Sequence, residues 1–301
     1  MTDVMVGAIR PEWREVTVKR RPQSFFTRVL KTRGAAFGLF MVVVVLVLAV
    51  LGGILAPYDP NKSDPNIILQ APSFAHLMGT DHLGRDVLSR SLNGAQVAVL
   101  AGLISVGFAL IVGSIIGLLA GYWGGWVDDI LMRLVDTLWS FPTLVLALAI
   151  AASLGPGLTN AMIAIGIVFT PAFARLVRGQ ALSVRERDFI LAERVLGAGP
   201  LRIMVLHIWP NVVGPIIVQS SLMVAQAIIV EASLSFLGLG VEPPNASWGS
   251  MLRSGYQYLE RAPWVSFFPG TAIFLTVLAL NLLGDGLRVA MDPRMRGKGT
   301  S

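Results

Sequence analysis

Five long stretches of this 301-residue chain contain no charged side chain. A helix needs about 20 predominantly apolar residues to cross the hydrocarbon core of a bilayer, and all of these stretches exceed that length. They cover residues 34–56, 91–127, 137–174, 203–230 and 262–284. The stretch 137–174 is long enough for nearly two crossings, and it contains the turn sequence LGPGLTN at 154–160. The pattern predicts a membrane protein, because the cores of soluble proteins do not use charge-free helices of this length.

We therefore predict an all-α integral membrane protein with six transmembrane helices. The composition agrees, since 54% of the residues are hydrophobic and 14% are charged, whereas a soluble domain carries about 25% charged residues. The first tract is too long for the apolar region of a signal peptide and is expected to remain as an uncleaved anchor. The expected spans are 34–56, 92–120, 130–153, 158–178, 211–238 and 263–285, within a transmembrane domain of 34–285.

The basic residues predict the orientation of the chain. An even number of spans places both termini on one side of the membrane. In this arrangement 19 of the 24 Lys and Arg residues share that side, and five fall on the other. Short cytoplasmic segments carry the excess of Lys and Arg, so both termini and the charged segment 175–207 are expected in the cytoplasm. The chain has no cysteine, which excludes disulfides and thiol chemistry.

The cytoplasmic N-terminal segment, 1–33, is expected to contain a helix lying in the membrane interface. The sequence QSFFTRVLK at 23–31 places Phe25, Phe26, Val29 and Leu30 on one helical face, which is typical of interfacial helices. The alternative is a basic tail without fixed structure. Membrane lipid is thus an expected partner and nucleic acid is not, because no basic cluster interleaved with aromatic residues occurs elsewhere. Residues 286–301 are expected to form a cytoplasmic tail.

A charged segment, FILAERVLGAGPLRIMVLHIWPNV at 189–212, interrupts the apolar chain. We predict a short helix over 188–196 that Gly197 ends in the left-handed conformation. A second helix is expected to start at Pro200, with Gly199 as its cap.

The first of these helices offers a small apolar surface. It is formed by Ala192, Val195, Leu196 and Ala198, with Glu193 and Arg194 at its rim. A short helix with such a face can lie in a groove on a partner protein. The alternative is an ordinary solvated loop without a partner.

Two acidic residues are expected at or near membrane depth, where an ionisable side chain is by default a candidate for function. Asp136 lies three residues from Arg133, which favours a local ion pair. Glu231 has no evident local partner, and we leave open whether it forms an interhelical hydrogen bond or belongs to a transport pathway. The last four spans each contain a proline, which occurs in pathway-forming bundles and in plain bundles alike.

The sequence GTDHLGRDVLSR at 79–90 has two acid–base pairs at the spacing i,i+4. Asp81 with Arg85, and Asp86 with Arg90, have the favoured order on a helix. We predict a surface helix capped by Thr80 or Asp81. A metal site formed by His76, Asp81, His82 and Asp86 is a weaker alternative, because the spacing matches no standard site.

No catalytic motif is evident. The chain lacks GxxxxGK[ST], the third glycine of a dinucleotide-binding fingerprint, and the Gly-x-Ser-x-Gly elbow. Its three histidines divide between the two sides of the membrane. We expect no enzymatic site, no metal and no cofactor bound by this chain.

Several longer motifs together resemble one known family. They are GTDHLGRDVLSR, RLVDTLWSFPTLVLALA, PAFARLVRGQAL, EASLSFLGLGVEPPNASWGSML and LTVLALNLLGDGLRVAMDP. The chain resembles, over about residues 20–295, the permease subunits of ATP-binding-cassette importers for dipeptides, oligopeptides and nickel, and more narrowly their C-type subunit. The resemblance implies a type I importer permease fold in a bacterial or archaeal cytoplasmic membrane.

The resemblance also implies partners. These are a homologous second permease, two cytoplasmic ATPase subunits that use ATP and Mg, and an extracytoplasmic solute-binding protein. The outer loops, 57–91 and 240–262, would face the second permease and the binding protein. The cargo could be a dipeptide, a longer peptide, glutathione, a nickel complex or another small solute.

The family docks its ATPases through a cytoplasmic loop with the pattern Glu-Ala-Ala, three residues, Gly and a later Pro. Here Gly197 and Pro210 fit, whereas positions 191–193 read Leu-Ala-Glu. The resemblance assigns ATPase docking to the loop 179–210, through Ala192, Glu193, Val195, Leu196, Gly197, Ala198 and Pro200. Glu231 is the candidate pathway residue. An ion-coupled secondary transporter acting alone is the alternative, but only one deep acid and no paired broken helices are evident.

Overall fold

The computed structural model describes residues 33–291, and the chain there is almost entirely helical. The main helices are α2 (Arg33–Leu55), α3 (Val87–Trp123), α4 (Gly125–Trp139), α5 (Thr143–Leu154), α6 (Leu158–Arg185), α7 (Asp188–Val195), α8 (Pro200–Arg202), α9 (Trp209–Leu237), α10 (Trp248–Tyr256) and α11 (Trp264–Met291). A 3₁₀ helix, η1 (Pro65–Ile67), and a π-helix, η2 (Ile203–Ile208), complete the set. The all-α prediction is confirmed. The interfacial helix predicted within 1–33 lies outside the described residues.

Five helical segments are long and apolar enough to span a membrane. They are Gly34–Leu55, Val87–Trp123, Leu158–Arg185, Pro200–Leu237 and Trp264–Met291. The pair α4 and α5 passes the same test jointly, but the two helices are bent by 92°. Six spans therefore result if this pair counts as one, and the third span is a broken one rather than the continuous helix expected over 130–153.

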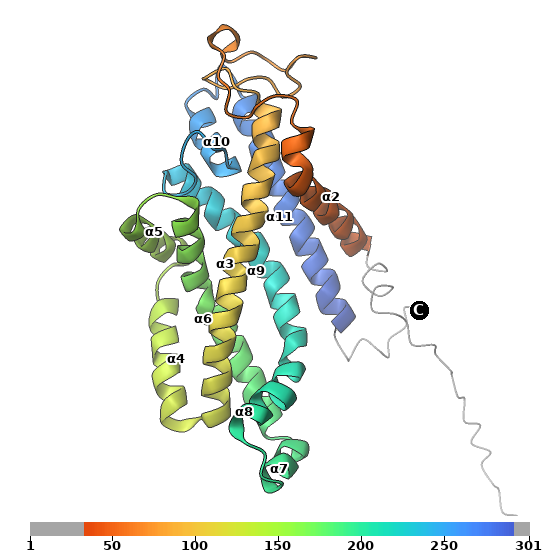
Figure 1. Cartoon of the computed structure of the whole chain (residues 1–301), viewed down its shortest axis with the longest axis vertical. Coiled ribbons are helices and arrows are strands. Elements are labelled where there is room, and N and C mark those ends of the chain that lie inside the picture. Colours follow the sequence, from red (N-terminus) through yellow and green to blue (C-terminus); the bar gives the residue numbers. More distant parts are fainter. Residues whose placement is uncertain (1–32, 292–301) are drawn as a thin grey trace, which may run out of the picture.

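The bundle is elongated, with different structures at its two ends (Figure 1). We call the end that carries α7 and α8 the hairpin end. The opposite end, which we call the cap end, consists of residues 56–86 and 238–262, including η1 and α10. The helices between the two ends expose large apolar side chains, such as Val50 and Ile54 on α2.

Helices α3 and α6 form the most intimate contact of the bundle, because glycines of α3 face the backbone of α6. A Cβ atom built on Gly117 would lie 2.5 Å from the carbonyl oxygen of Ala174. At Gly113 it would lie 2.7 Å from the carbonyl oxygen of Thr170. Small residues allow membrane helices to approach closely, and van der Waals packing then drives their association.

The break between α4 and α5 has a local cause. Pro142 has no N–H to donate to a preceding turn, and it disfavours the helical conformation of the residue before it. Its own backbone is extended, with ψ 128°, and it stands directly before α5. The chain turns here, so α4 and α5 pack separately against neighbouring helices.

Ion pairs attach α4 to α6. The Arg178 guanidinium donates two hydrogen bonds to the Asp128 carboxylate, the second 2.6 Å long. Arg175 Nη2 lies 2.7 Å from Asp136 Oδ1, and its guanidinium stacks 4.7 Å above the Trp139 ring. The prediction that Asp136 pairs with Arg133 was wrong, because Arg175 on the facing helix is its partner.

Replacing Gly117 with valine should destabilise the fold, because the added side chain has no room against α6. Overpacking of this kind costs about 1–3 kcal/mol. Gly107→Val on the same helix is the control, since nothing lies within 4 Å of a Cβ there. The measurement is the temperature at which detergent-purified protein loses its monodisperse elution. Equal melting temperatures for the two variants would contradict the close α3–α6 contact.

Candidate functional site

Helices α7 and α8 form a helical hairpin, whose joint is the segment around Gly197. At this joint the C-terminus of α7 is closed by backbone hydrogen bonds. Gly197 has φ 80°, in the left-handed region. Its N–H donates to the Arg194 carbonyl, and the Ala198 N–H donates to the Glu193 carbonyl, both at 3.0 Å. This pair of bonds is the Schellman motif, in which glycine is the usual left-handed residue. The conformation predicted for Gly197 is confirmed.

The second arm of the hairpin begins where it was predicted, with Gly199 as N-cap and Pro200 in the first turn of α8. It is not a separate helix, however. The short α8 continues through the π-helix η2 into α9, so the helical path runs without a loop from the hairpin end to Leu237. The expected fifth span, 211–238, thus starts about three turns earlier. π-helical turns occur frequently at functional sites.

An apolar surface covers the tip of the hairpin. Val195 and Leu196 are 88% and 82% exposed, and Leu201 is 72% exposed. Val205 and Leu206 extend this surface along η2. We call these five residues the docking face, after the role that the sequence analysis predicted for this segment. Only the first two belonged to the predicted set. The other three follow Pro200 in the sequence LRIMVLHI, where the buried Ile203 and Ile208 already mark the opposite side of the helix.

The hairpin is anchored to the bundle on its other side. Ile190 is completely buried. Arg185 Nη1 donates to the carbonyls of Gly121 and Tyr122 at the end of α3, and the Arg194 guanidinium lies 5.5 Å from the Tyr122 ring. The apolar tip is therefore exposed on a structure that is fixed to α3.

Glu193, predicted to lie at the rim of the apolar surface, also contacts the second arm of the hairpin. Its carboxylate oxygen Oε1 lies 3.6 Å from His207 Nε2, and both side chains are about three-quarters buried. This contact joins α7 to η2 across the joint. Among the predicted docking residues, Ala192 and Pro200 are exposed and Ala198 is half-buried.

At the cap end, the predicted surface helix over 79–90 was wrong. Residues 80–86 form a turn, and α3 begins only at Val87. Asp81 Oδ1 accepts hydrogen bonds from the N–H groups of Leu83 and Arg85, which closes the turn. Asp86, rather than Thr80 or Asp81, caps the helix by accepting from the Ser89 N–H at 2.8 Å. The side chain of an aspartate competes here with helical backbone bonding.

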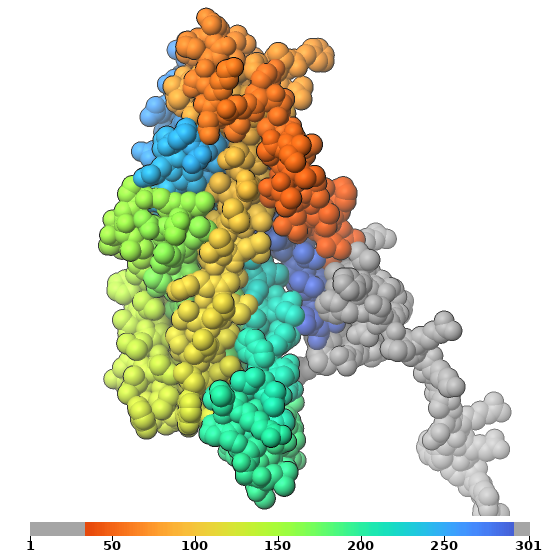
Figure 2. All heavy atoms as spheres, viewed as in Figure 1, coloured from red at the N-terminus to blue at the C-terminus, as the bar shows by residue number. Residues whose placement is uncertain are grey.

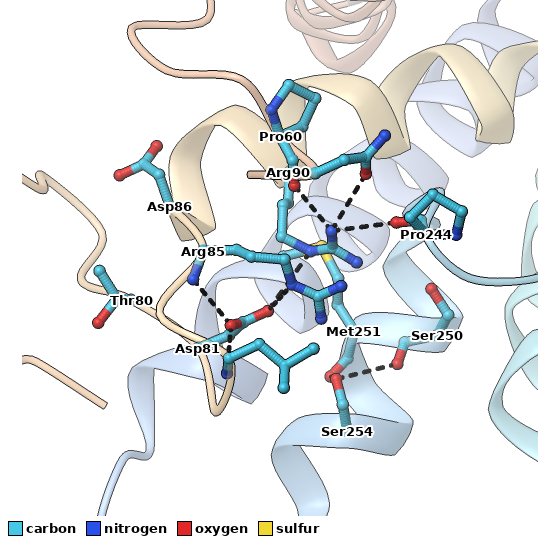
Figure 3. Close-up of polar contacts among 12 residues, drawn as sticks. Pro60, Thr80, Asp81, Arg85, Asp86, Arg90, Pro244, Ser250, Met251 and Ser254 are labelled. Carbon is cyan, nitrogen blue, oxygen red and sulfur yellow. Dashed lines mark hydrogen bonds and ion pairs between the residues drawn. The ribbon is translucent and has the colours of Figure 1, made fainter. Parts of the chain in front are cut away.

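The charges of this motif are buried, and they join three segments of the chain (Figure 3). Arg85 Nε lies 2.7 Å from Asp81 Oδ2. Arg90 lies 3.6 Å from the same oxygen, and its Nη1 donates to the carbonyls of Pro60 and Pro244 at 2.8 and 3.3 Å. Asp81 thus pairs with two arginines. One of them, Arg90, also binds the loops before α3 and after α9.

The two histidines of the cap end have separate surroundings. His76 Nδ1 lies 2.9 Å from Asp86 Oδ1. The His82 ring stacks on Tyr258 at 5.6 Å, and burial lowers the pKa of His82. No group of three potential metal ligands occurs within residues 33–291, and the alternative of a metal site at this motif gains no support.

Glu231 is buried near the end of α9. Its Oε1 accepts a hydrogen bond of 2.7 Å from Ser235 Oγ, one turn further along the same helix. Ser235 Oγ in turn accepts from the Val241 N–H at 3.2 Å. The geometry favours a hydrogen-bonding role, which positions the loop after α9.

A helical bundle with one bent span and a helical hairpin at one end also characterises a known protein family. Residues 113–297 match the family described as binding-protein-dependent transport system inner membrane component. Residues 23–72 match the N-terminal TM domain of oligopeptide transport permease C. The chain belongs to the binding-protein-dependent permease family. It is a non-catalytic, multi-pass component of the cytoplasmic membrane that works with other components of an ABC transporter.

Named permeases from several bacteria are similar over nearly their whole length. The di/tripeptide transport system permease protein DppC of Pseudomonas aeruginosa (strain UCBPP-PA14) is 44% identical over 280 residues, 91% of this chain and 92% of the relative. The glutathione transport system permease protein GsiD of Pectobacterium atrosepticum is 44% identical over 291 residues, 96% of each chain. The resemblance inferred from the sequence motifs is confirmed.

A solved structure shares the permease fold. The MetNI methionine ABC transporter in an inward-facing conformation matches with a TM-score of 0.55 at 18% sequence identity. The match covers 67% of this chain and 96% of that one. At this level of identity the likeness concerns the fold alone.

Asp81→Asn should strongly destabilise this permease, because it leaves Arg85 and Arg90 buried without a counter-charge. Removing one partner of a buried ion pair costs about 3–5 kcal/mol. Asp59→Asn at the same end is the control, since that aspartate is exposed. Yield and melting temperature of the purified permease should fall for Asp81→Asn alone. A variant as stable as the control would show that the cluster does not hold the cap end together.

Proposed function

We propose that this permease is one of two homologous membrane subunits of an ATP-driven importer for dipeptides, oligopeptides or a related small solute. Each subunit would form half of the translocation pathway. The exposed docking face on an anchored hairpin is the observation that supports this proposal most strongly, because it offers a water-soluble partner a rigid apolar surface. The names of the similar permeases, which include di/tripeptide and glutathione systems, support the cargo class.

The hairpin end would lie in the cytoplasm. The hairpin and the ends of α6 and α8 carry Arg185, Arg187, Arg194 and Arg202, in agreement with the excess of basic residues on cytoplasmic loops. Both termini would lie on that side. The cap end would then face outward, where an extracytoplasmic solute-binding protein delivers the cargo.

Two ATPase subunits would bind the hairpins of the two permeases. The apolar docking face, together with Ala192, Gly197, Ala198 and Pro200, would lie in a groove of the ATPase, which is a usual mode of recognition for a short helix. ATP and Mg would bind to these partners, since this chain has no phosphate-binding loop. The permease itself would bind no cofactor.

A stand-alone ion-coupled transporter is less well supported. Such a protein needs an ionisable group that is accessible from the pathway. Glu231, the deep acid on which that alternative depends, is 1% exposed and hydrogen-bonded to Ser235.

Uptake by reconstituted vesicles tests the proposed function. The complete complex, with its binding protein outside and ATP inside, should accumulate a radiolabelled dipeptide. Uptake should disappear when ATP or the binding protein is left out, and a protonophore should not reduce it. Uptake by this chain and the second permease without ATPase subunits, driven by an ion gradient, would contradict the proposal.

Gly197→Val should uncouple the permease from its ATPases. A side chain in the left-handed region costs about 1–2 kcal/mol, and a branched one should cost more. Relief of that strain would turn the docking face away from its position. Since 1.4 kcal/mol corresponds to a factor of ten, we expect ATPase binding to weaken roughly tenfold, with an unchanged yield of permease.

Gly179→Val is the matched control for this experiment. Gly179 lies in α6 near the same end, in helical conformation and with nothing within 4 Å of a Cβ. Co-purification of the ATPases with the tagged permease, together with vesicle uptake, is the measurement. Full recovery of the ATPases with Gly197→Val would mean that the hairpin is not the docking element.

A further inference from the structure

A hollow of about 440 Å³ opens between three segments toward the cap end. Its walls come from the first turns of α3, from the turn between α5 and α6, and from the loop between α9 and α10. The surfaces of α3, α5 and α10 meet on the face shown in Figure 2. The volume falls within the range of small-molecule binding sites, about 300–1,000 Å³.

Four polar side chains line the hollow: Asn93, Gln96, Glu242 and Asn245. Within residues 33–291 none of them makes a side-chain hydrogen bond. Asn93 and Gln96 are three residues apart and therefore lie on one face of α3, a membrane-spanning helix. Polar side chains in a membrane span face other protein groups or water-filled cavities. The donors and acceptors of this hollow are thus free for a solute from the aqueous side.

The loop that carries Glu242 and Asn245 is held at two points. On one side, the Val241 N–H donates to Ser235 Oγ, which itself donates to the buried Glu231. On the other side, the Pro244 carbonyl accepts from Arg90 of the buried charge cluster. These supporting contacts position the backbone of the loop before a ligand arrives, so that Glu242 and Asn245 have to order only their side chains.

The chemistry of the lining selects a ligand class. Glu242 is the charged group among the ten lining residues, and a carboxylate forms strong, charge-assisted hydrogen bonds with an ammonium group. The three amide side chains both donate and accept, which suits the N–H and C=O groups of a peptide. Leu100 and Leu158 provide an apolar wall for a side chain.

We propose that this hollow binds the amino-terminal residue of a cargo peptide, with the α-ammonium group on Glu242 and the first peptide group against Asn93, Gln96 and Asn245. The inference rests on the proposed function, since it names a binding site for its peptide cargo. It assigns Glu231 a positioning role, because Glu231 acts on the loop through Ser235.

The chain contains no cysteine, which permits a direct binding test in the assembled transporter. Leu100→Cys places one thiol in the wall of the hollow, away from the proposed polar contacts. The complex is reconstituted with partner subunits that lack reactive cysteines, and the rate of labelling by a water-soluble maleimide is measured. Alanyl-alanine at millimolar concentration should slow the labelling at least threefold, and N-acetyl-alanyl-alanine should have no effect.

Two further variants test the role of the carboxylate. Glu242→Gln in the Leu100→Cys background should abolish the protection by alanyl-alanine. Glu260→Gln is the control, because it makes the same change at an exposed position of the cap end outside the hollow and should leave the protection intact. Assembly of each complex is checked by co-purification of the ATPases.

Four outcomes would overturn the inference. Equal protection by the free and the acetylated dipeptide, or protection that survives in Glu242→Gln, would refute the ammonium site. A thiol that is never labelled and instead cross-links to the second permease would show that a neighbouring subunit fills the hollow. Absence of protection in a complex that performs ATP-dependent dipeptide uptake would refute the site and leave the proposed function standing.

Discussion

The close contact between α3 and α6 is the constraint on which the rest of the structure depends. Within a bilayer, helices gain little from the hydrophobic effect on association, so close packing has to hold them together. The glycines at 113 and 117 let α3 reach the backbone of α6. These two helices also lead to the two ends of the molecule: Asp86 at the cap end caps α3, and α6 leads directly into the hairpin.

Ion pairs hold together the parts of the fold that lie outside the glycine-mediated contact of α3 with α6. Along α6, Arg175 and Arg178 attach the short helix α4 through carboxylates on its facing side. At the cap end, Arg90 pairs with Asp81 and also binds the loop before α3 and the loop after α9. A buried charge without a partner is costly, so these contacts select one arrangement of the segments that they join. The segments at the cap end thereby acquire a defined geometry.

Local rules predicted the features that depend on neighbouring residues. Hydrophobic length indicated the spans, and the need for a left-handed residue identified Gly197 as the hairpin joint. The prediction of a surface helix over 79–90 was wrong, because the spacing of Asp81 and Arg85 suits both a helix and a tight turn. The hydrogen bonds from the Leu83 and Arg85 N–H groups to the Asp81 carboxylate select the turn. The partner of Asp136 lies 39 residues away on another helix, where no local pattern could have identified it.

The continuous helical path from Pro200 to Leu237 connects the two candidate sites. One end of this path carries the docking face, and the other leads into the loop with Glu242 and Asn245. Because no flexible loop interrupts it, a displacement of the hairpin would be transmitted along α9 toward that loop. The π-helix η2 interrupts the α-helical hydrogen-bonding pattern of this path next to the docking face. Asn93 and Gln96 lie on α3, which is packed against α6, so a shift of α9 relative to α3 would change the width of the hollow between them. Coupling between ATPase docking and peptide binding would then follow from the connectivity of the helices.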